Sequence, residues 1–236
     1  MKNKLAYTLA ILTVLVISGF SMFGVDRIML RMESQSLQAG KTAVLHADLY
    51  YQALDGKLIT RMDAPINKVM ITNRQGELTI YDPEDQTVYR TRELEYSSEN
   101  NLIFFFLTGK TQDLGLGDMG FTIDRTEFKD GLLITQWIPP RAHSHVFSHI
   151  ELVHEDHLPI YAAYFDAAGK MIKKVFYSDF EIYSDVILPL TVTEFNYLPG
   201  GDSIVNRVRF SDVRTNRQAV SSWFEFEIPD DARYID

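Results

Sequence analysis

Hydrophobic and polar residues alternate along most of this 236-residue chain. In residues 69–92, Val69 and Ile71 and then Leu78 and Ile80 occupy every second position, a spacing that places side chains on one face of an extended strand. The sequences RQG and DPED lie between these apolar pairs and after them, and their Gly and Pro residues favour turns. This stretch therefore predicts three short strands in an antiparallel meander.

The alternation continues on both sides of this meander. Ala43, Leu45, Ala47, Leu49 and Tyr51 fall on one side of a strand that follows Gly40, and Asp55-Gly56 is a hairpin signal leading into residues 58–62. Roughly a dozen sequential strands favour an up-and-down barrel or a strongly curved antiparallel sheet, because curling protects the edges. Beyond residue 120 the pattern predicts strands over 121–128, 132–138, 150–154, 160–165, 171–182, 186–197, 203–213 and 223–228.

Two segments predict helices instead. Residues 26–38, DRIMLRMESQSLQ, begin with a possible N-cap at Asp26 and consist mostly of helix-forming residues. Ile28 and Met32 share one face of this predicted N-terminal helix, and Gly40 follows its end. The second segment, SSENNLIFFFLTGKTQDL, has a capping serine and a terminating Gly109. It predicts a short internal helix.

The internal helix carries a continuous apolar block. Three adjacent phenylalanines cannot all face one side of a strand, so the block predicts a segment that packs against, or plugs, an apolar concavity. A buried core helix is the simpler interpretation on general frequency. The block consists of Leu102, Ile103, Phe104, Phe105, Phe106 and Leu107.

The N-terminus has the order of a secretory signal. Lys2 and Lys4 precede an apolar run, and small residues follow at Ser18, Gly19 and Ser21. The apolar run continues far enough to serve as an uncleaved membrane anchor. We therefore expect residues 1–25 to be a signal peptide or an N-terminal anchor and residues 26–236 to be one domain. The protein is expected to be periplasmic, and an uncleaved N-terminal segment would anchor it to the inner membrane.

Composition excludes several classes of function. The chain has no cysteine, which excludes disulfides, thiol catalysis and a lipidated N-terminal Cys. Its formal net charge of −9 argues against nucleic acid as a partner and against docking on an anionic membrane surface. It contains no G-x-S-x-G or H-E-x-x-H motif. We expect a non-enzymatic protein without a cofactor.

Two further patterns have ordinary interpretations. Residues 115–120 match G-x-G-x-x-G, but a predicted strand follows where a dinucleotide site needs a helix. We interpret them as a flexible loop. The histidine-rich stretch 143–157 contains His143, His145 and His149 as metal candidates. Its spacing is loose and it shows no dedicated set of carboxylate or thiolate ligands, so we expect no metal there. The alternative role is pH sensing.

The segment ITNRQGELTIYDPEDQTVY resembles the corresponding part of the LolA-like family of periplasmic lipoprotein carriers. In that family a proline, a short strand, a Gly turn and Tyr-Asp-Pro follow in the same order, which here is residues 65–83. Residues 100–109 resemble its lid helix, and FEIYSDVILPLTV resembles its late hairpin. The sequence FEFEIPDDA resembles its C-terminal strand.

This resemblance implies an unclosed half-barrel with the N-terminal helix and the short internal helix as lid. Residues 102–107, Ile28 and Met32 are then the expected lid and lipid contacts. The partners implied are acyl chains of lipoproteins or lipids, an inner-membrane donor and an outer-membrane acceptor. The family uses an arginine to latch its lid. The corresponding place here is Leu54-Asp55, so that arginine is absent or displaced, and Arg61 is only a nearby candidate to which no latch role is assigned. The expected cargo therefore also includes free lipids and glycolipids. The alternative is a membrane-anchored sensor or scaffold of the same fold that binds a protein.

Overall fold

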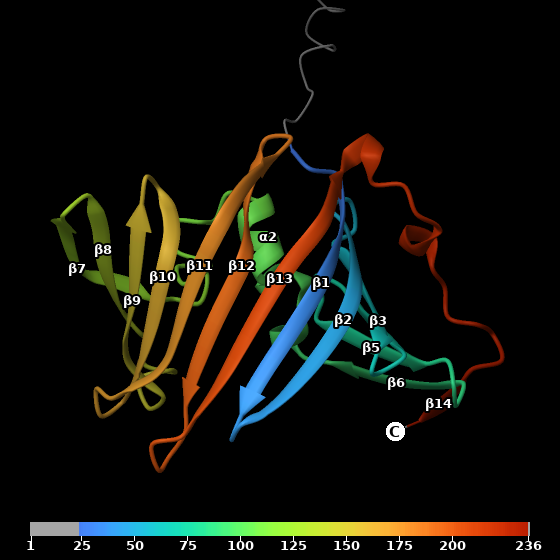
Figure 1. The fold of residues 1–236 in the computed structure, drawn as a ribbon, viewed down its shortest axis with the longest axis horizontal. Coiled ribbons are helices and arrows are strands. Elements are labelled where there is room, and N and C mark those ends of the chain that lie inside the picture. Colours follow the sequence, from blue (N-terminus) through green and yellow to red (C-terminus); the bar gives the residue numbers. More distant parts are fainter. Residues whose placement is uncertain (1–23, 236) are drawn as a thin grey trace, which may run out of the picture.

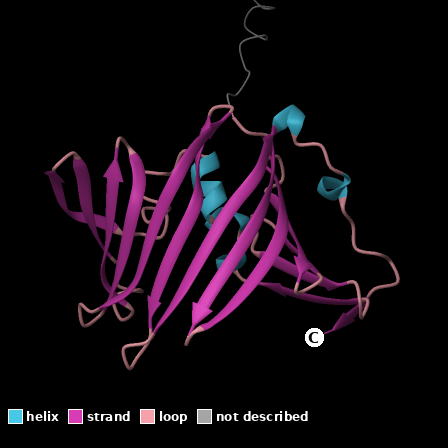
Figure 2. Cartoon of the chain, viewed as in Figure 1, coloured by secondary structure: helices cyan, strands magenta, loops and turns pink. Residues whose placement is uncertain are grey.

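The computed structural model describes residues 24–235 of the chain. In this part the chain forms one open sheet of 14 strands, which curves around a short helix, α2 (Figure 1). Strands dominate and the few helices are short (Figure 2). The prediction of a mainly β protein with a curved, unclosed sheet and a short internal helix is confirmed.

The long strands lie in the middle of the sheet and the short ones toward its edges. The helical elements are the 3₁₀ turns η1 (Leu94–Tyr96), η2 (Ser98–Asn100), η3 (Asn216–Gln218) and η4 (Ser222–Glu225), and helix α2 (Leu102–Leu107). The strands are β1 (Arg27–Gln38), β2 (Lys41–Gln52), β3 (Lys57–Ala64), β4 (Lys68–Thr72), β5 (Glu77–Asp82), β6 (Thr87–Arg92), β7 (Thr122–Lys129), β8 (Leu132–Ile138), β9 (Phe147–Glu155), β10 (Leu158–Asp166), β11 (Met171–Tyr183), β12 (Val186–Tyr197), β13 (Ser203–Thr215) and β14 (Arg233–Ile235).

The strand order shows how the chain places its helix. It reads β14-β6-β5-β4-β3-β2-β1-β13-β12-β11-β10-β9-β8-β7, so β1 starts in the middle and the meander β1 to β6 runs outward. The chain then crosses to the opposite edge, enters β7 and returns through a second meander to β13, which pairs with β1. The crossover, residues 93–121, contains η1, η2 and α2. Because it connects the two edges, it must pass over one face of the sheet.

The predicted N-terminal helix over 26–38 is wrong, because Arg27–Gln38 is strand β1, paired on one side with β2 and on the other with β13. Ile28 and Leu30 are buried on one face, while Met29 packs on the other. Pairing on both edges overrides the helix propensity of the segment. The supposed helix-ending Gly40 instead forms a two-residue hairpin with Ala39, both at positive φ (47° and 74°).

The predicted strand over 223–228 is also wrong. Residues 222–225 form η4, and the chain after it runs as a strap over the sheet to a short strand, β14. Trp223, Phe224 and Phe226 attach this strap by packing their rings against the sheet, so it needs no backbone ladder. Strand β14 pairs with β6 in parallel, an exception to the expected antiparallel pattern that no sequence signal indicated.

The meander predicted over residues 69–92 is confirmed as β4, β5 and β6 in antiparallel register.

Among the described residues, no helix is both long and apolar enough to cross a membrane. The expected signal or anchor over residues 1–25 lies almost wholly outside the described part of the chain.

Two apolar clusters lie on opposite faces of the sheet. The concave face is the one that the crossover covers, and its cluster combines α2 with residues of β1, β2 and β9 to β12. The convex face carries a smaller cluster, formed by Tyr50, Ile59 and Val69 of the sheet under Phe224 of the strap. The alternation of β2 serves both, because Ala47, Leu49 and Tyr51 face α2 and Tyr50 faces the strap.

Candidate functional site

Helix α2 lies on the concave face as a plug with an apolar inner side. Ile103, Phe104 and Phe106 are buried. The Phe106 ring lies 6.1 Å from that of Phe180 and 6.5 Å from that of Tyr177. The prediction that the apolar block packs into a concavity therefore agrees with where the helix lies. Leu102, Phe105 and Leu107 are partly buried against the same cluster.

Local hydrogen bonds define both ends of α2. The Asn101 side chain caps the first turn, accepting from the backbone N–H of Phe104 at 2.9 Å. At the other end the Thr108 hydroxyl donates to the Phe104 carbonyl at 2.7 Å, and Gly109 follows in the left-handed region at φ 70°. The cap is Asn101, three positions after Ser98, and not one of the predicted serines, because Ser97 caps η2 instead.

The chain leading into α2 is tied to the hairpin turns of one side of the sheet. The Ser98 hydroxyl donates to the Gly56 carbonyl at 2.5 Å, and Arg74 Nε lies 2.9 Å from Glu99 Oε1. Arg74 also donates to the carbonyl oxygen of Ala53 at 2.5 Å. Sequence reasoning missed Arg74, which lies in a turn and shows no motif.

The arginine that the sequence suggested lies elsewhere. Arg61 is on the convex face, 3.7 Å from Asp48 and 5.0 Å from the centre of the Trp223 ring. Among the interactions of the described residues, Arg61 has none with α2.

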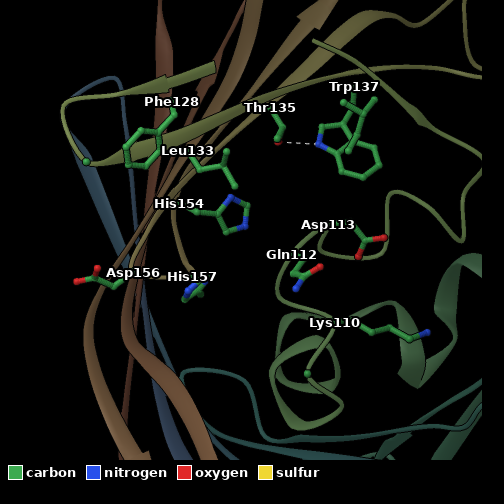
Figure 3. A pocket seen from close by; sticks show the side chains of 13 residues that line it. Lys110, Gln112, Asp113, Phe128, Leu133, Thr135, Trp137, His154, Asp156 and His157 are labelled. Carbon is green, nitrogen blue, oxygen red and sulfur yellow. Dashed lines mark hydrogen bonds between the residues drawn. The ribbon is translucent and has the colours of Figure 1, made fainter. Parts of the chain in front are cut away.

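A cavity of about 740 Å³ opens beside α2, between the concave side of β7 to β9 and the first residues of the loop after α2 (Figure 3). One wall is apolar, formed by Phe128, Leu133 and Trp137. The opposite side is polar. The volume of the cavity lies within the range of cavities that bind small ligands. The lining residues are Gly109, Lys110, Gln112, Asp113, Ile123, Phe128, Gly131, Leu133, Thr135, Trp137, His154, Asp156 and His157.

Apolar side chains at the edge of this cavity are exposed to an unusual degree. Phe128 is 75% exposed and Ile123 is 52% exposed, and both belong to β7, the last strand of the sheet. Exposed large apolar residues gathered at one place mark a surface that binds something apolar. Neither residue was singled out from the sequence; the alternation over β7 and β8 indicated strands but not which positions lacked a cover.

His154 lies in the wall of the cavity with one nitrogen unpaired. The residue is 5% exposed, and its Nε2 lies 3.0 Å from the carbonyl oxygen of Thr111 in the crossover loop. Its Nδ1 is buried and has no hydrogen-bond partner. His154 belongs to the histidine-rich stretch, but its role in the wall follows from the position of the loop.

A polar group lies farther along the concave face. Lys173 Nζ is 2.5 Å from Glu194, and the Asn196 side chain donates to Glu194 at 2.6 Å. Glu194 is opposite Val175 in the sheet register, and Val175 belongs to the concave cluster. Burial raises the pKa of Glu194, but the hydrogen bonds from Lys173 and Asn196 outweigh it, so the pKa is lowered overall.

Two tyrosines of this face stay protonated because burial disfavours the phenolate. Burial, with a smaller effect of the Glu194 charge, raises the pKa of Tyr164 to about 12. Burial likewise raises the pKa of Tyr177, which packs against Phe106. These two phenols are therefore neutral at pH 7, beside the paired Lys173 and Glu194.

The structure brings the predicted lipid-contact residues into one cluster. Ile28 is 1% exposed and Met32 packs beside it in the same cluster as residues 102–107. They reach that cluster as floor residues of strand β1, however, and not as part of a helical lid. Whether any of these residues contacts a lipid stays a prediction.

The metal candidates do not gather. His149 stacks on Phe165 with ring centres 4.1 Å apart, and His143 stacks on Phe121 at 6.2 Å. His145 is exposed. Within residues 24–235, no group of three or more His, Cys, Asp or Glu side chains has an arrangement that could bind a metal ion.

The glycine-rich segment is a loop of the crossover. It leads into strand β7 instead of a helix, as the sequence predicted. Gly115 has φ 81°, and a Cβ built there would lie 2.7 Å from two ring atoms of Phe105. The loop thus packs glycine directly against the outer side of α2.

No protein-family model matches the chain, and no curated protein matches it. Solved structures do. A LolA superfamily protein of Nitrosomonas europaea superimposes with a TM-score of 0.57 at 11% identity, over 86% of this chain and 90% of the other. The chain has the LolA-like fold.

Two further structures agree in extent. A putative outer membrane lipoprotein-sorting protein domain of Vibrio parahaemolyticus gives a TM-score of 0.58 at 16% identity, over 86% of this chain and 90% of that domain. A DUF1329 family protein of Desulfovibrio piger gives 0.58 at 15% identity, over 85% and 89%. The LolA-like fold therefore extends over most of the chain, in agreement with the resemblance found in its sequence.

Proposed function

We propose that this protein is an exported, non-enzymatic carrier that shields the acyl chains of lipoproteins or lipids on its concave face. The observation that carries the proposal is the cavity beside α2, with Phe128, Leu133 and Trp137 on one wall of an open sheet. Removing an acyl chain from water yields about 0.8 kcal/mol per CH₂ group. A preformed apolar wall is sufficient for that, and no covalent chemistry is needed.

Helix α2 is the proposed lid. It fills the concave face next to the cavity through Phe104 and Phe106, and it is a short segment within the crossover. Displacing it would extend the cavity toward Leu30 and Phe210, which line the narrow crevice beneath it. A longer acyl chain could then lie along the floor formed by the central strands. The proposal extends to a periplasmic location and to handover between an inner-membrane donor and an outer-membrane acceptor. The signal-like order of the N-terminal residues and the LolA-like fold support it.

The experiment is mass spectrometry of the protein purified from its own compartment without detergent, both as the intact native species and as an organic extract. We expect acylated molecules in stoichiometric amount. A folded protein free of acylated species would contradict the carrier proposal and favour the anchored scaffold.

A matched pair of variants locates the cargo. Leu133→Asp places a charge on the cavity wall, where Leu133 is 38% exposed. Leu37→Asp makes the same change at a residue that is 44% exposed on β1, outside the residues that line the cavity. We expect L133D to lose its acylated cargo and L37D to retain it. Equal retention in both would place the cargo elsewhere on the protein.

A further inference from the structure

The cavity contains one unpaired hydrogen-bond acceptor, and it determines which ligands fit best. Among the described residues that line the cavity, His154 Nδ1 is the one buried side-chain polar atom without a partner. A buried polar group left unpaired costs free energy that a suitable ligand recovers. Such an atom in a ligand cavity therefore points to a complementary group on the ligand.

The bond at the other ring nitrogen fixes what that group is. Nε2 of His154 lies 3.0 Å from the Thr111 carbonyl oxygen, and a carbonyl can only accept a hydrogen bond. Nε2 must therefore carry the proton. In the neutral ring Nδ1 then has a free lone pair and accepts, so its partner is an N–H or O–H donor.

The neighbouring polar groups of the wall are already occupied. Trp137 Nε1–H donates to the Thr135 hydroxyl at 2.9 Å, and that hydroxyl lies 3.5 Å from the Leu152 carbonyl oxygen. Leu133 is directly opposite His154 in the sheet register. The acceptor thus sits in a wall that is otherwise apolar or already paired.

The charges of the cavity disfavour an anionic head group. Asp113 and Asp156 line it, and the amine of Lys110 is paired with Asp118 at 2.6 Å. A carboxylate or phosphate would meet acidic side chains and an ammonium group that already has a partner. A neutral polar group fits better.

We propose that the cavity selects neutral amphiphiles whose aliphatic chain is joined to a hydrogen-bond donor, a secondary amide or a hydroxyl, that donates to His154 Nδ1. The aliphatic chain lies along Phe128, Leu133 and Trp137. Because Nδ1 is covered without ligand, the entering donor displaces the side chains over it. This inference rests on the proposed function and adds the chemical class of the ligand.

The test compares ligands in which a methyl group replaces the hydrogen of the donor. The probes are N-methyldodecanamide and N,N-dimethyldodecanamide, with dodecanol and its methyl ether as the hydroxyl pair. The purified full chain carries Trp223→Phe, which leaves Trp137 in the cavity wall as the sole tryptophan and fluorescent reporter. We expect the amide to bind about tenfold more tightly than its dimethyl analogue, and His154→Phe to bring the two affinities together.

The ratio of affinities separates the possible failures. If neither the amide pair nor the hydroxyl pair differs in affinity for the protein with His154 intact, the donor proposal is wrong and the carrier proposal stands. If none of the four probes binds, both are wrong. Selectivity in one pair only identifies the donor as amide or hydroxyl.

A second measurement covers the case in which H154F does not fold. In protein labelled with ¹⁵N-histidine, the resonance of His154 Nδ1 should shift when the secondary amide is added and should stay in place with the dimethyl amide. A resonance that responds equally to both would overturn the assignment, because a direct hydrogen bond requires the donor.

Discussion

Replacing Phe106 with alanine tests whether α2 is a lid that opens by itself. The side chain is 3% exposed and packs between Tyr177 and Phe180, so its removal should cost about 3–5 kcal/mol of packing free energy. If α2 detaches as a local unit, this loss lowers the free energy that is needed to open it. A loss of 3 kcal/mol corresponds to about a hundredfold increase in opening.

The assay is native-state hydrogen exchange of the amides in and after α2. Those of Phe105, Thr108 and Lys110 donate to backbone carbonyls within the segment and report its opening. In F106A we expect these amides to exchange about a hundredfold faster. The free energy of unfolding from urea titration should fall by about the same amount as the free energy of opening, because the Phe106 side chain loses its packing both when α2 opens and when the domain unfolds.

Phe224→Ala is the matched control. Phe224 is also 3% exposed, but it lies in the convex cluster under the strap. F224A should lower the free energy of unfolding and leave the exchange of α2 close to that of the unmodified protein. The reasoning would be refuted if F224A accelerated the α2 amides by the same factor as the amides of the central strands, because α2 would then open only with the whole domain.

Three further predictions follow from the same face. Gly115→Ala should accelerate hydrogen exchange in α2, because Gly115 has φ 81° and the added Cβ would collide with the Phe105 ring. Gly169→Ala is the control for backbone strain alone, because Gly169 has φ 78° and open space around it. Between about pH 5 and pH 3, the free energy of unfolding from urea titration should fall less in Glu194→Gln than in the unmodified protein. The lowered pKa of Glu194 stabilises the folded protein above the ordinary carboxyl pKa of 4.5, and this stabilisation disappears on acidification. Equal losses would contradict this. Tyr164, with its pKa raised to about 12, should make the protein less stable from about pH 10 upward, because the phenol ionises more readily in the unfolded chain; Tyr164→Phe should reduce this alkaline loss, measured by thermal unfolding.

The crossover explains why the fold has a site at all. A sheet built as one continuous meander would leave its concave face bare, whereas here the chain must pass from β6 to the opposite edge. The connection carries Ile103, Phe104 and Phe106 onto the concave face. Its loop residue Thr111 fixes the ring of His154, so one segment forms both the proposed lid and part of the cavity wall.

Local patterns in the sequence were sufficient for most of the strands and their turns. The period-two spacing of β2 and of the β4 to β6 meander is a property of neighbouring residues, because an extended chain places alternate side chains on opposite faces. Hairpins such as Asp130-Gly131, with both residues at positive φ, are likewise set by local chemistry. The apolar block 102–107 indicated a helix that needed an apolar partner surface.

Tertiary structure decided the rest. Residues 26–38 have helix propensity, yet pairing with β2 and β13 on both edges makes them a strand, and the partner β13 lies far away in the sequence. Phe224 and Phe226 alternate like strand residues but attach a strap by ring packing. Preferences between neighbouring residues therefore set most of the extended segments and the turns that join them. Strand order, the covered face and the unpaired His154 nitrogen depend on contacts between distant segments, and so do the exceptions over residues 26–38 and 223–228.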